Sequence, residues 1–203
     1  MADAQGNEAQ FRRDLVSLLK EQLGEELPRR KLCIGENVKV LYDITATVEI
    51  GRFEPRLGFL EQDIVFINTA TVDPKLALYF RNTTEFAKIC VPRLVIETKY
   101  KGISSHALMT YSNIAMRIKG IFAHAKYYLL LRYDDKSAET LLRHGIGFDR
   151  IIQLETIKGT AQINRYVPGE FKHDLASNRG LCSRFDRLIQ TIRADFVDEK
   201  LIV

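Results

Sequence analysis

Pro92-Arg-Leu-Val-Ile-Glu-Thr-Lys-Tyr-Lys101 is the stretch of sequence that best indicates how the chain folds. It is short and mostly apolar, and it lies between a proline and Gly102, which is typical of a buried β-strand. Because side chains alternate along a strand, Glu97 and Lys99 should share one face and Thr98 should lie on the other. A strand that is apolar on both faces is usually central in its sheet. Burying a carboxylate and an ammonium there is costly unless both have partners, so this stretch predicts a central strand that carries a polar site.

Composition places the chain among ordinary globular proteins. At 203 residues, it is long enough to bury a sizeable core. The sequence has no apolar run of the length that a membrane-spanning helix needs, and the first eight residues lack the pattern of a secretory signal. The cysteines, Cys33, Cys90 and Cys182, are scattered and odd in number. This favours a reducing compartment and a cytoplasmic location, and it argues against a disulfide scaffold and against zinc.

Positive charge is unevenly distributed along the chain. The net charge is +4, yet the segment 98–133 contains six basic residues and no acid. Such a run is compatible with a surface that faces a polyanion, and equally with a solvated basic face that has no partner. The basic residues of this segment are Lys99, Lys101, Arg117, Lys119, Lys126 and Arg132.

Hydrophobic periodicity predicts alternating helices and strands. In chain order we expect a helix over 11–27 that Pro28 ends, antiparallel strands over 38–50 and 57–68 joined by a loop at 51–56, a short helix or irregular stretch over 79–88, the strand over 92–101, a crossover helix over 104–124, a parallel strand over 126–133, a helix over 137–145, a strand over 148–154 and a helix over 183–196. Residues 156–182 carry little periodicity. These elements predict one α/β domain over 1–203, with a core over about 11–154 and a C-terminal extension over 155–203.

Two separated parts of the sequence resemble a known signature. Asp63, followed after thirty-three residues by Glu97-Thr98-Lys99, resembles the bipartite motif of the PD-(D/E)XK nuclease superfamily. The resemblance implies a restriction-endonuclease-like fold, in which a mixed β-sheet is flanked by helices in the core order αβββαβ. It covers roughly 11–133, and Gln62 stands where the motif has proline.

The three-residue half of this motif is not specific by itself. The chain contains five (D/E)-x-K triplets, which begin at Asp73, Glu97, Asp134, Glu170 and Asp198. Only the triplet at Glu97 interrupts an apolar strand, follows a strand with an acid and precedes a crossover helix. Structural context therefore selects this triplet as the candidate site.

Phosphodiester hydrolysis explains these residue types. A Mg²⁺ ion can neutralise charge on the phosphate and generate hydroxide near neutral pH, and it prefers a few carboxylates together with waters. Asp63 and Glu97 are the candidate ligands, and the family resemblance adds the backbone carbonyl of Thr98. Lys99 would orient the attacking water and stabilise negative charge. The structural alternatives are a strand-edge acid at Asp63 and an exposed Glu97–Lys99 salt bridge.

Several other polar residues lie near this site in the predicted fold. Lys101, Ser104, His106 and Arg117 are candidates for contacts with a nucleic-acid backbone, since they surround the start of the crossover helix or follow its polar stripe. Further acids for the metal site are Glu61, on the face of Asp63, and Glu21 or Glu25, on the first helix.

We therefore expect a Mg²⁺-dependent endonuclease that acts on double-stranded DNA. A compact chain in this superfamily resembles a type II restriction endonuclease, which implies a homodimer, with base-reading residues in loops or in 156–182. One alternative is a non-catalytic nucleic-acid-binding or assembly protein that keeps the fold. Another is a nuclease specific for RNA or for a DNA structure such as a junction.

Overall fold

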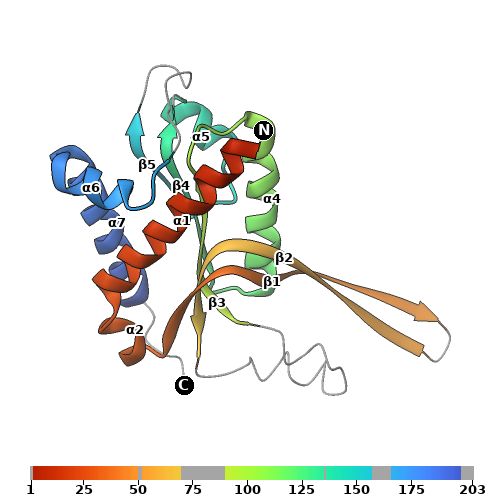
Figure 1. Ribbon diagram of the computed structural model, residues 1–203. Helices are drawn as coiled ribbons and strands as arrows, with labels where there is room; N and C mark the ends of the chain where they lie inside the picture. Colours follow the sequence, from red (N-terminus) through yellow and green to blue (C-terminus); the bar gives the residue numbers. More distant parts are fainter. Residues whose placement is uncertain (1, 50–51, 70–89, 135, 157–165, 198–203) are drawn as a thin grey trace.

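The computed structural model describes residues 2–49, 52–69, 90–134, 136–156 and 166–197, which form a five-stranded mixed sheet flanked by helices (Figure 1). The strands lie side by side in sequence order. Strands β1, β2 and β3 pair antiparallel, and β3, β4 and β5 pair parallel. The predicted α/β class, a mixed sheet flanked by helices, is confirmed. The strands are β1 (Leu32–Glu49), β2 (Arg52–Asn68), β3 (Pro92–Lys99), β4 (Lys126–Asp134) and β5 (Arg150–Thr156).

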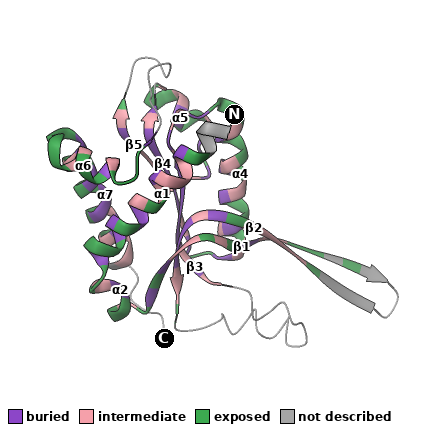
Figure 2. Cartoon of the chain, viewed as in Figure 1, coloured by how far each residue is buried: buried purple, intermediate pink, exposed green. Residues whose placement is uncertain are grey.

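Strand β3 is central, as its sequence predicts, and its alternation defines two layers. Leu94 and Ile96 belong to the apolar core that also holds side chains of the terminal helices, whereas Val95 belongs to the core under the crossover helix. Figure 2 shows the buried residues concentrated on the central strands and on the inner sides of the helices. The helices are α1 (Ala2–Leu23), α2 (Glu26–Arg29), α4 (Ser105–Ile121), α5 (Ala138–His144), α6 (Glu170–Ser177) and α7 (Arg179–Val197).

The first helix was predicted with the wrong bounds. It begins at Ala2 rather than Phe11, and tertiary contacts hold its early turns: buried Asn7 accepts a hydrogen bond from the backbone N–H of Tyr166 at 3.0 Å. It ends at Leu23 because Gly24 follows, a residue that commonly terminates helices. Pro28 does not end it but lies within α2, a single turn, where a missing N–H costs nothing.

The first two strands are also longer than predicted. The segment 51–56 was predicted as a loop, yet β2 begins at Arg52 and its ladder with β1 continues to the pair Glu49 and Arg52. Pro55 stands opposite Ala46 in this ladder, in the part of β2 that lies beyond its pairing with β3. A proline is tolerated there because no further strand needs its N–H. The two strands project from the body as a ribbon in Figure 1, and the helix predicted over 79–88 lies outside the described residues.

The C-terminal helices pack onto the same core as α1. Phe171, Leu181 and Phe185 are buried in the apolar layer that contains Phe11 and Leu15 of α1. In the segment 156–182, where the sequence shows little periodicity, residues 166–182 contain α6 and the start of α7, and 157–165 lie outside the described residues. No helix in the described parts of the chain has the length and apolar character of a membrane span.

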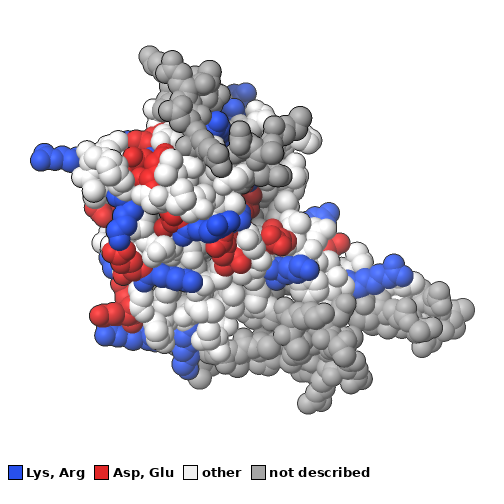
Figure 3. Space-filling model, viewed as in Figure 1, with Lys and Arg blue, Asp and Glu red and all other residues white. Residues whose placement is uncertain are grey.

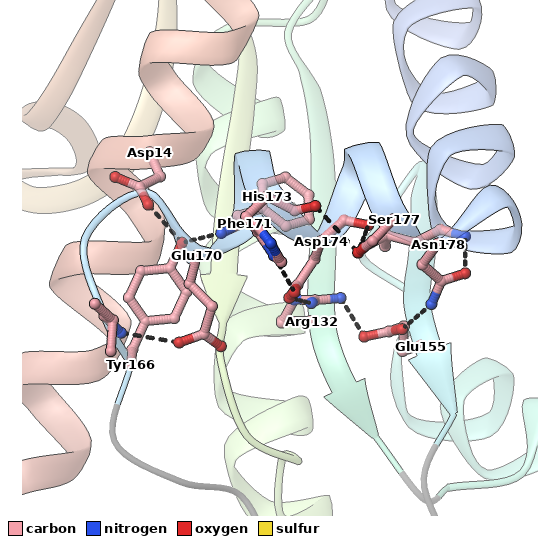
Figure 4. Close-up of polar contacts among 12 residues, drawn as sticks. Asp14, Arg132, Glu155, Tyr166, Glu170, Phe171, His173, Asp174, Ser177 and Asn178 are labelled. Carbon is pink, nitrogen blue, oxygen red and sulfur yellow. Dashed lines mark hydrogen bonds and ion pairs between the residues drawn. The ribbon is translucent and has the colours of Figure 1, made fainter.

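A buried polar cluster around Arg132 fixes α6 to the sheet (Figure 4). Arg132 on β4 is only 1% exposed and forms ion pairs with Glu155 on β5 and, at 2.6 Å, with Asp174 on α6. On the other side, the hydroxyl of Tyr166 donates to Asp14 of α1 at 2.6 Å. The turn before α6 is thus tied to α1, and the helix itself is tied to β4 through Arg132, which also pairs with β5.

Candidate active site

The candidate site lies where β2 and β3 stop pairing. Their backbone ladder includes the pair Ile64 and Ile96. One residue further along β2, the side chain of Asp63, rather than its backbone, bonds to β3. Asp63 Oδ2 accepts hydrogen bonds from the backbone N–H and from the hydroxyl of Thr98, both at 2.8 Å. The carboxylate thus stands in for a backbone acceptor, and its position relative to Glu97-Thr98-Lys99 is fixed by β3.

The acids of the two strands lie close together at the end of the β2–β3 ladder. Val95 packs in the core under α4, so by alternation Glu97 and Lys99 share that side, while Asp63 binds the backbone and the hydroxyl of Thr98 between them. Besides burial, repulsion by Asp63 raises the pKa of Glu97, as expected for two carboxylates close together. The structure therefore brings together Asp63 and Glu97, which the sequence separates by thirty-three residues.

Lys99 lies between two carboxylates. Its Nζ is 2.9 Å from Oε1 of Glu97 and 2.9 Å from Oε1 of Glu8, and it stands 4.7 Å from the ring centroid of Tyr111. The side chains of Lys99 and Glu97 are 14% and 7% exposed. The alternative of a Glu97–Lys99 salt bridge on an exposed face is therefore wrong, because Glu97 is buried and Lys99 is largely shielded from water.

Helix α1 contributes two charged residues that the sequence did not indicate. Besides Glu8, Arg12 donates from Nη1 to Oδ1 of Asp63 at 2.6 Å and from Nε to Oε1 of Glu36 at 3.1 Å. The expected start of the helix at Phe11 excluded Glu8 from consideration. The signal for both was their spacing, since residues four apart on a helix share a face and can reach one site together.

Glu21 and Glu25, two other candidate acids for the metal site, lie away from Asp63 and Glu97 and have other partners. Glu21 pairs with Lys172 at 3.0 Å, and Glu25 pairs with Arg29 on the surface. Glu61 is exposed, although it follows the same alternation as Asp63. The contacts of α1 with Asp63 and Lys99 come from Arg12 and Glu8, nearer the start of the helix.

Burial and charge shift the pKa values of the two β3 residues. Burial, followed by repulsion from Asp63, raises the pKa of Glu97 to about 7, although Lys99 lowers it in part. For Lys99, burial alone would lower the pKa, but Glu97 and Glu8 outweigh it and raise the pKa. Lys99 therefore stays protonated at neutral pH, whereas Glu97 exchanges a proton there.

The donor set fits one Mg²⁺ ion with several waters. Two carboxylates, from Asp63 and Glu97, and the nearby Thr98 carbonyl are the oxygen ligands that Mg²⁺ prefers, and this ion rarely has an all-protein cage. The described residues contain no group of three or more His, Cys, Asp or Glu side chains that could hold a metal ion, so water would supply the remaining ligands. The charge balance also fits. With all groups ionised, four acids and two bases leave two negative charges in this cluster, which consists of Glu8, Glu36, Asp63, Glu97, Arg12 and Lys99.

The residues predicted to contact nucleic acid lie around α4, but their side chains differ in availability. The hydroxyl of Ser104 caps the helix by accepting from the N–H of Ala107 at 3.1 Å. His106 is exposed. Arg117 is exposed and forms an ion pair with Asp43 at 3.4 Å, and Lys101 is half-buried.

The acid-free run 98–133 does not form an unopposed basic surface. Acids from other segments pair with at least five of its six basic residues, among them Lys99, Arg117, Lys119, Lys126 and Arg132. Figure 3 likewise shows acidic and basic side chains interspersed on the face that it displays. Linear charge runs therefore overstate positive potential here, because folding brings acids from other parts of the chain beside the bases.

Comparisons with known proteins give little beyond this geometry. No family model matches the chain, and no curated protein matches it. A solved structure described as the native BbvCI A2B2 tetramer at low resolution is similar, with a TM-score of 0.39 and 14% sequence identity over 74% of this chain. The match spans 58% of the length of that chain.

Proposed function

We propose that this chain is a Mg²⁺-dependent endonuclease that hydrolyses phosphodiester bonds of double-stranded DNA. The observation that carries the proposal is the proximity of Asp63, Glu97 and Lys99 at the point where β2 and β3 stop pairing. Two carboxylates and an ammonium there are largely withdrawn from water, which is costly without a function or full pairing.

Asp63, Glu97 and the carbonyl of Thr98 would hold the ion. The bound ion supplies charge neutralisation at the phosphate and a hydroxide at neutral pH. Thr98 fixes the carboxylate of Asp63 through two hydrogen bonds, so this ligand is positioned before a substrate arrives. Preorganised ligands of this kind lose little entropy on binding.

Lys99 would act on the attacking water and on the developing charge. Its ammonium is held by Glu97 and Glu8, which keep it protonated and limit its motion. A fixed cation in a water-poor site stabilises negative charge more strongly than it does in bulk water. Glu8 is then a positioning residue for Lys99.

Substrate contacts would come from the side of the site that α4 covers. Lys101, His106 and Arg117 are the candidates for phosphate contacts, since His106 and Arg117 are exposed on this helix and Lys101 follows β3. We further propose that the enzyme acts as a homodimer of the type II restriction class.

The test is cleavage of supercoiled plasmid with Mg²⁺, with and without EDTA. We expect Asp63→Ala and Lys99→Ala to abolish cutting while DNA binding and folding are kept. Glu139→Gln is the matched control, because Glu139 is an exposed acid on α5 in an ion pair with Arg143. Cutting that survives in both alanine variants would rule out this site as the catalytic centre.

A second candidate function is favoured by the pairing of the acids themselves. Protein groups hold both oxygens of Asp63, and Lys99 holds Oε1 of Glu97. Such pairing is also expected of a non-catalytic protein that binds nucleic acid and keeps the fold. Purified protein that binds DNA but never cuts it with Mg²⁺ or Mn²⁺ would support this function instead.

Substrate class can be decided in the same experiments. Digestion of a long DNA of mixed sequence, followed by sequencing of the fragment ends, separates a restriction enzyme from a less selective nuclease. Discrete fragments with a common end sequence are expected. Preferential cutting of RNA or of a four-way junction in a competition assay would instead indicate a structure-specific nuclease.

A further inference from the structure

The guanidinium of Arg12 lies on the carboxylate that the proposed metal site needs most. Asp63 Oδ2 already accepts two hydrogen bonds from Thr98, whereas Oδ1 is held by Nη1 of Arg12 at 2.6 Å. A carboxylate offers about four lone-pair positions, and the one left beside Oδ1 faces a fixed positive charge. A cation that binds Oδ1 of Asp63 is therefore repelled by the guanidinium of Arg12, which already contacts this oxygen.

We propose that Arg12 competes with the divalent cation for Asp63, so that the cation binds only when Arg12 leaves Oδ1. The inference rests on the proposed function, because the cation is the one that the nuclease would use. Arg12 and the cation carry charge of the same sign, and both would lie within bonding distance of one oxygen atom. Repulsion at that separation is strong in a site shielded from water.

Glu36 provides the place to which Arg12 can move. It accepts from Nε of Arg12 at 3.1 Å, and its side chain is 26% exposed, against 13% for Asp63. Arg12 can therefore release Asp63 and keep a charged partner at the edge of the site. The charge balance agrees, since the cluster around Arg12 and Lys99 has an excess of two negative charges when all its groups are ionised.

This arrangement predicts that substitutions of Arg12 and of Glu36 change the affinity for the cation in opposite directions. Arg12→Met removes the competitor, so the affinity for the cation should rise. Glu36→Gln removes the alternative partner of Arg12 but leaves the guanidinium, which should then hold Asp63 more firmly and weaken cation binding. If Arg12 merely kept Asp63 in place for the cation, Arg12→Met would weaken binding instead.

The experiment measures Mn²⁺ binding to the full chain at pH 8, by electron paramagnetic resonance of the free ion and by the rise in melting temperature with Mn²⁺ concentration. We expect the Kd of Arg12→Met to fall about tenfold, and that of Glu36→Gln to rise several-fold, as for loss of one charge-assisted hydrogen bond. Arg13→Met is the matched control, because Arg13 is an exposed neighbour on the same helix whose Nη1 donates to Gln10 at 3.4 Å. Its Kd should not change.

Two outcomes would overturn the inference, and they are distinguishable from failure of the nuclease proposal. If the wild-type chain binds Mn²⁺ through Asp63, as loss of binding in Asp63→Asn would show, but Arg12→Met binds no more tightly, the competition is refuted alone. If the wild-type chain binds no Mn²⁺ and cuts no DNA, both proposals fail. Should Arg12→Met not fold, Glu36→Gln decides by itself: unchanged or tighter binding refutes the competition.

Discussion

Replacing Glu97 with Gln should remove a pH dependence from the stability of the cation-free protein. Burial and repulsion from Asp63 raise the pKa of Glu97 from 4.5 to about 7. The folded chain therefore keeps a proton on this carboxyl between these two pH values, while the unfolded chain loses it. The stabilisation is complete below the unfolded pKa and is lost as the pH rises through the folded pKa.

The size of the effect follows from the two pKa values. One pH unit between them corresponds to about 1.4 kcal/mol, so the rise from 4.5 to about 7 is worth about 3 kcal/mol. Most of this contribution should be lost between pH 5 and pH 8. Because Lys99 is protonated throughout this range, Glu97 accounts for the change within the pair.

Urea unfolding in EDTA at pH 5 and pH 8 measures this contribution. Other titrating groups are common to both proteins, so the difference between wild type and Glu97→Gln isolates Glu97. We expect the variant to gain roughly 2–3 kcal/mol relative to wild type on going from pH 5 to pH 8. A difference that stays constant within about 0.5 kcal/mol would refute the reasoning, since it would mean that Glu97 is ionised over the whole range.

Three further predictions concern the frame of the site, and urea unfolding measures each. Arg132→Met should lower the free energy of unfolding by about 3 kcal/mol, because it leaves two acids without their buried partner. Arg143→Met, which breaks an exposed pair, should lower it by at most about 0.5 kcal/mol. Equal losses in the two variants would contradict this prediction. Gly147→Ala should lower the free energy of unfolding by more than about 2 kcal/mol, since the new Cβ would lie 2.0 Å from a backbone oxygen of α4. Gly120 is on α4 and has open space around it, so Gly120→Ala should raise the free energy of unfolding by about 0.5–1 kcal/mol. Ser104→Ala should cost about 1 kcal/mol through loss of the α4 cap, and an unchanged stability would show that the cap contributes nothing.

The sequence predicted the central part of the sheet well because local pattern and tertiary position agree there. Strand β3 is apolar on both faces and flanked by Pro92 and Gly102, so its length, burial and central place all follow from the same residues. The cap at Ser104 and the parallel crossover to β4 follow from equally local signals. Asp63 could be linked to Glu97 only through the resemblance, since no local pattern relates two strands so far apart.

The contributions of α1 could not be found in this way. Glu8 lies in a stretch with a weak helical pattern, and its place in α1 depends on contacts such as that of Asn7 with Tyr166. Arg12 reads as a surface residue of an amphipathic helix, yet its side chain is only 12% exposed. Partners of a buried charge depend on which segments meet in three dimensions, and single-sequence periodicity contains no such information.

The two buried polar clusters differ in what they do for the fold, and this difference bears on function. Removing Arg132 would break the ion pair of α6 with β4 and the ion pair of β5 with β4, so that cluster has a structural role. Helix α1 needs no such anchor, because Phe11 and Leu15 already bury completely in the apolar core. Ion pairs taken out of water seldom stabilise a protein more than apolar packing of the same volume would. The charges around Lys99 are therefore poorly explained by stability, and their excess of acid is the property that a divalent cation would use.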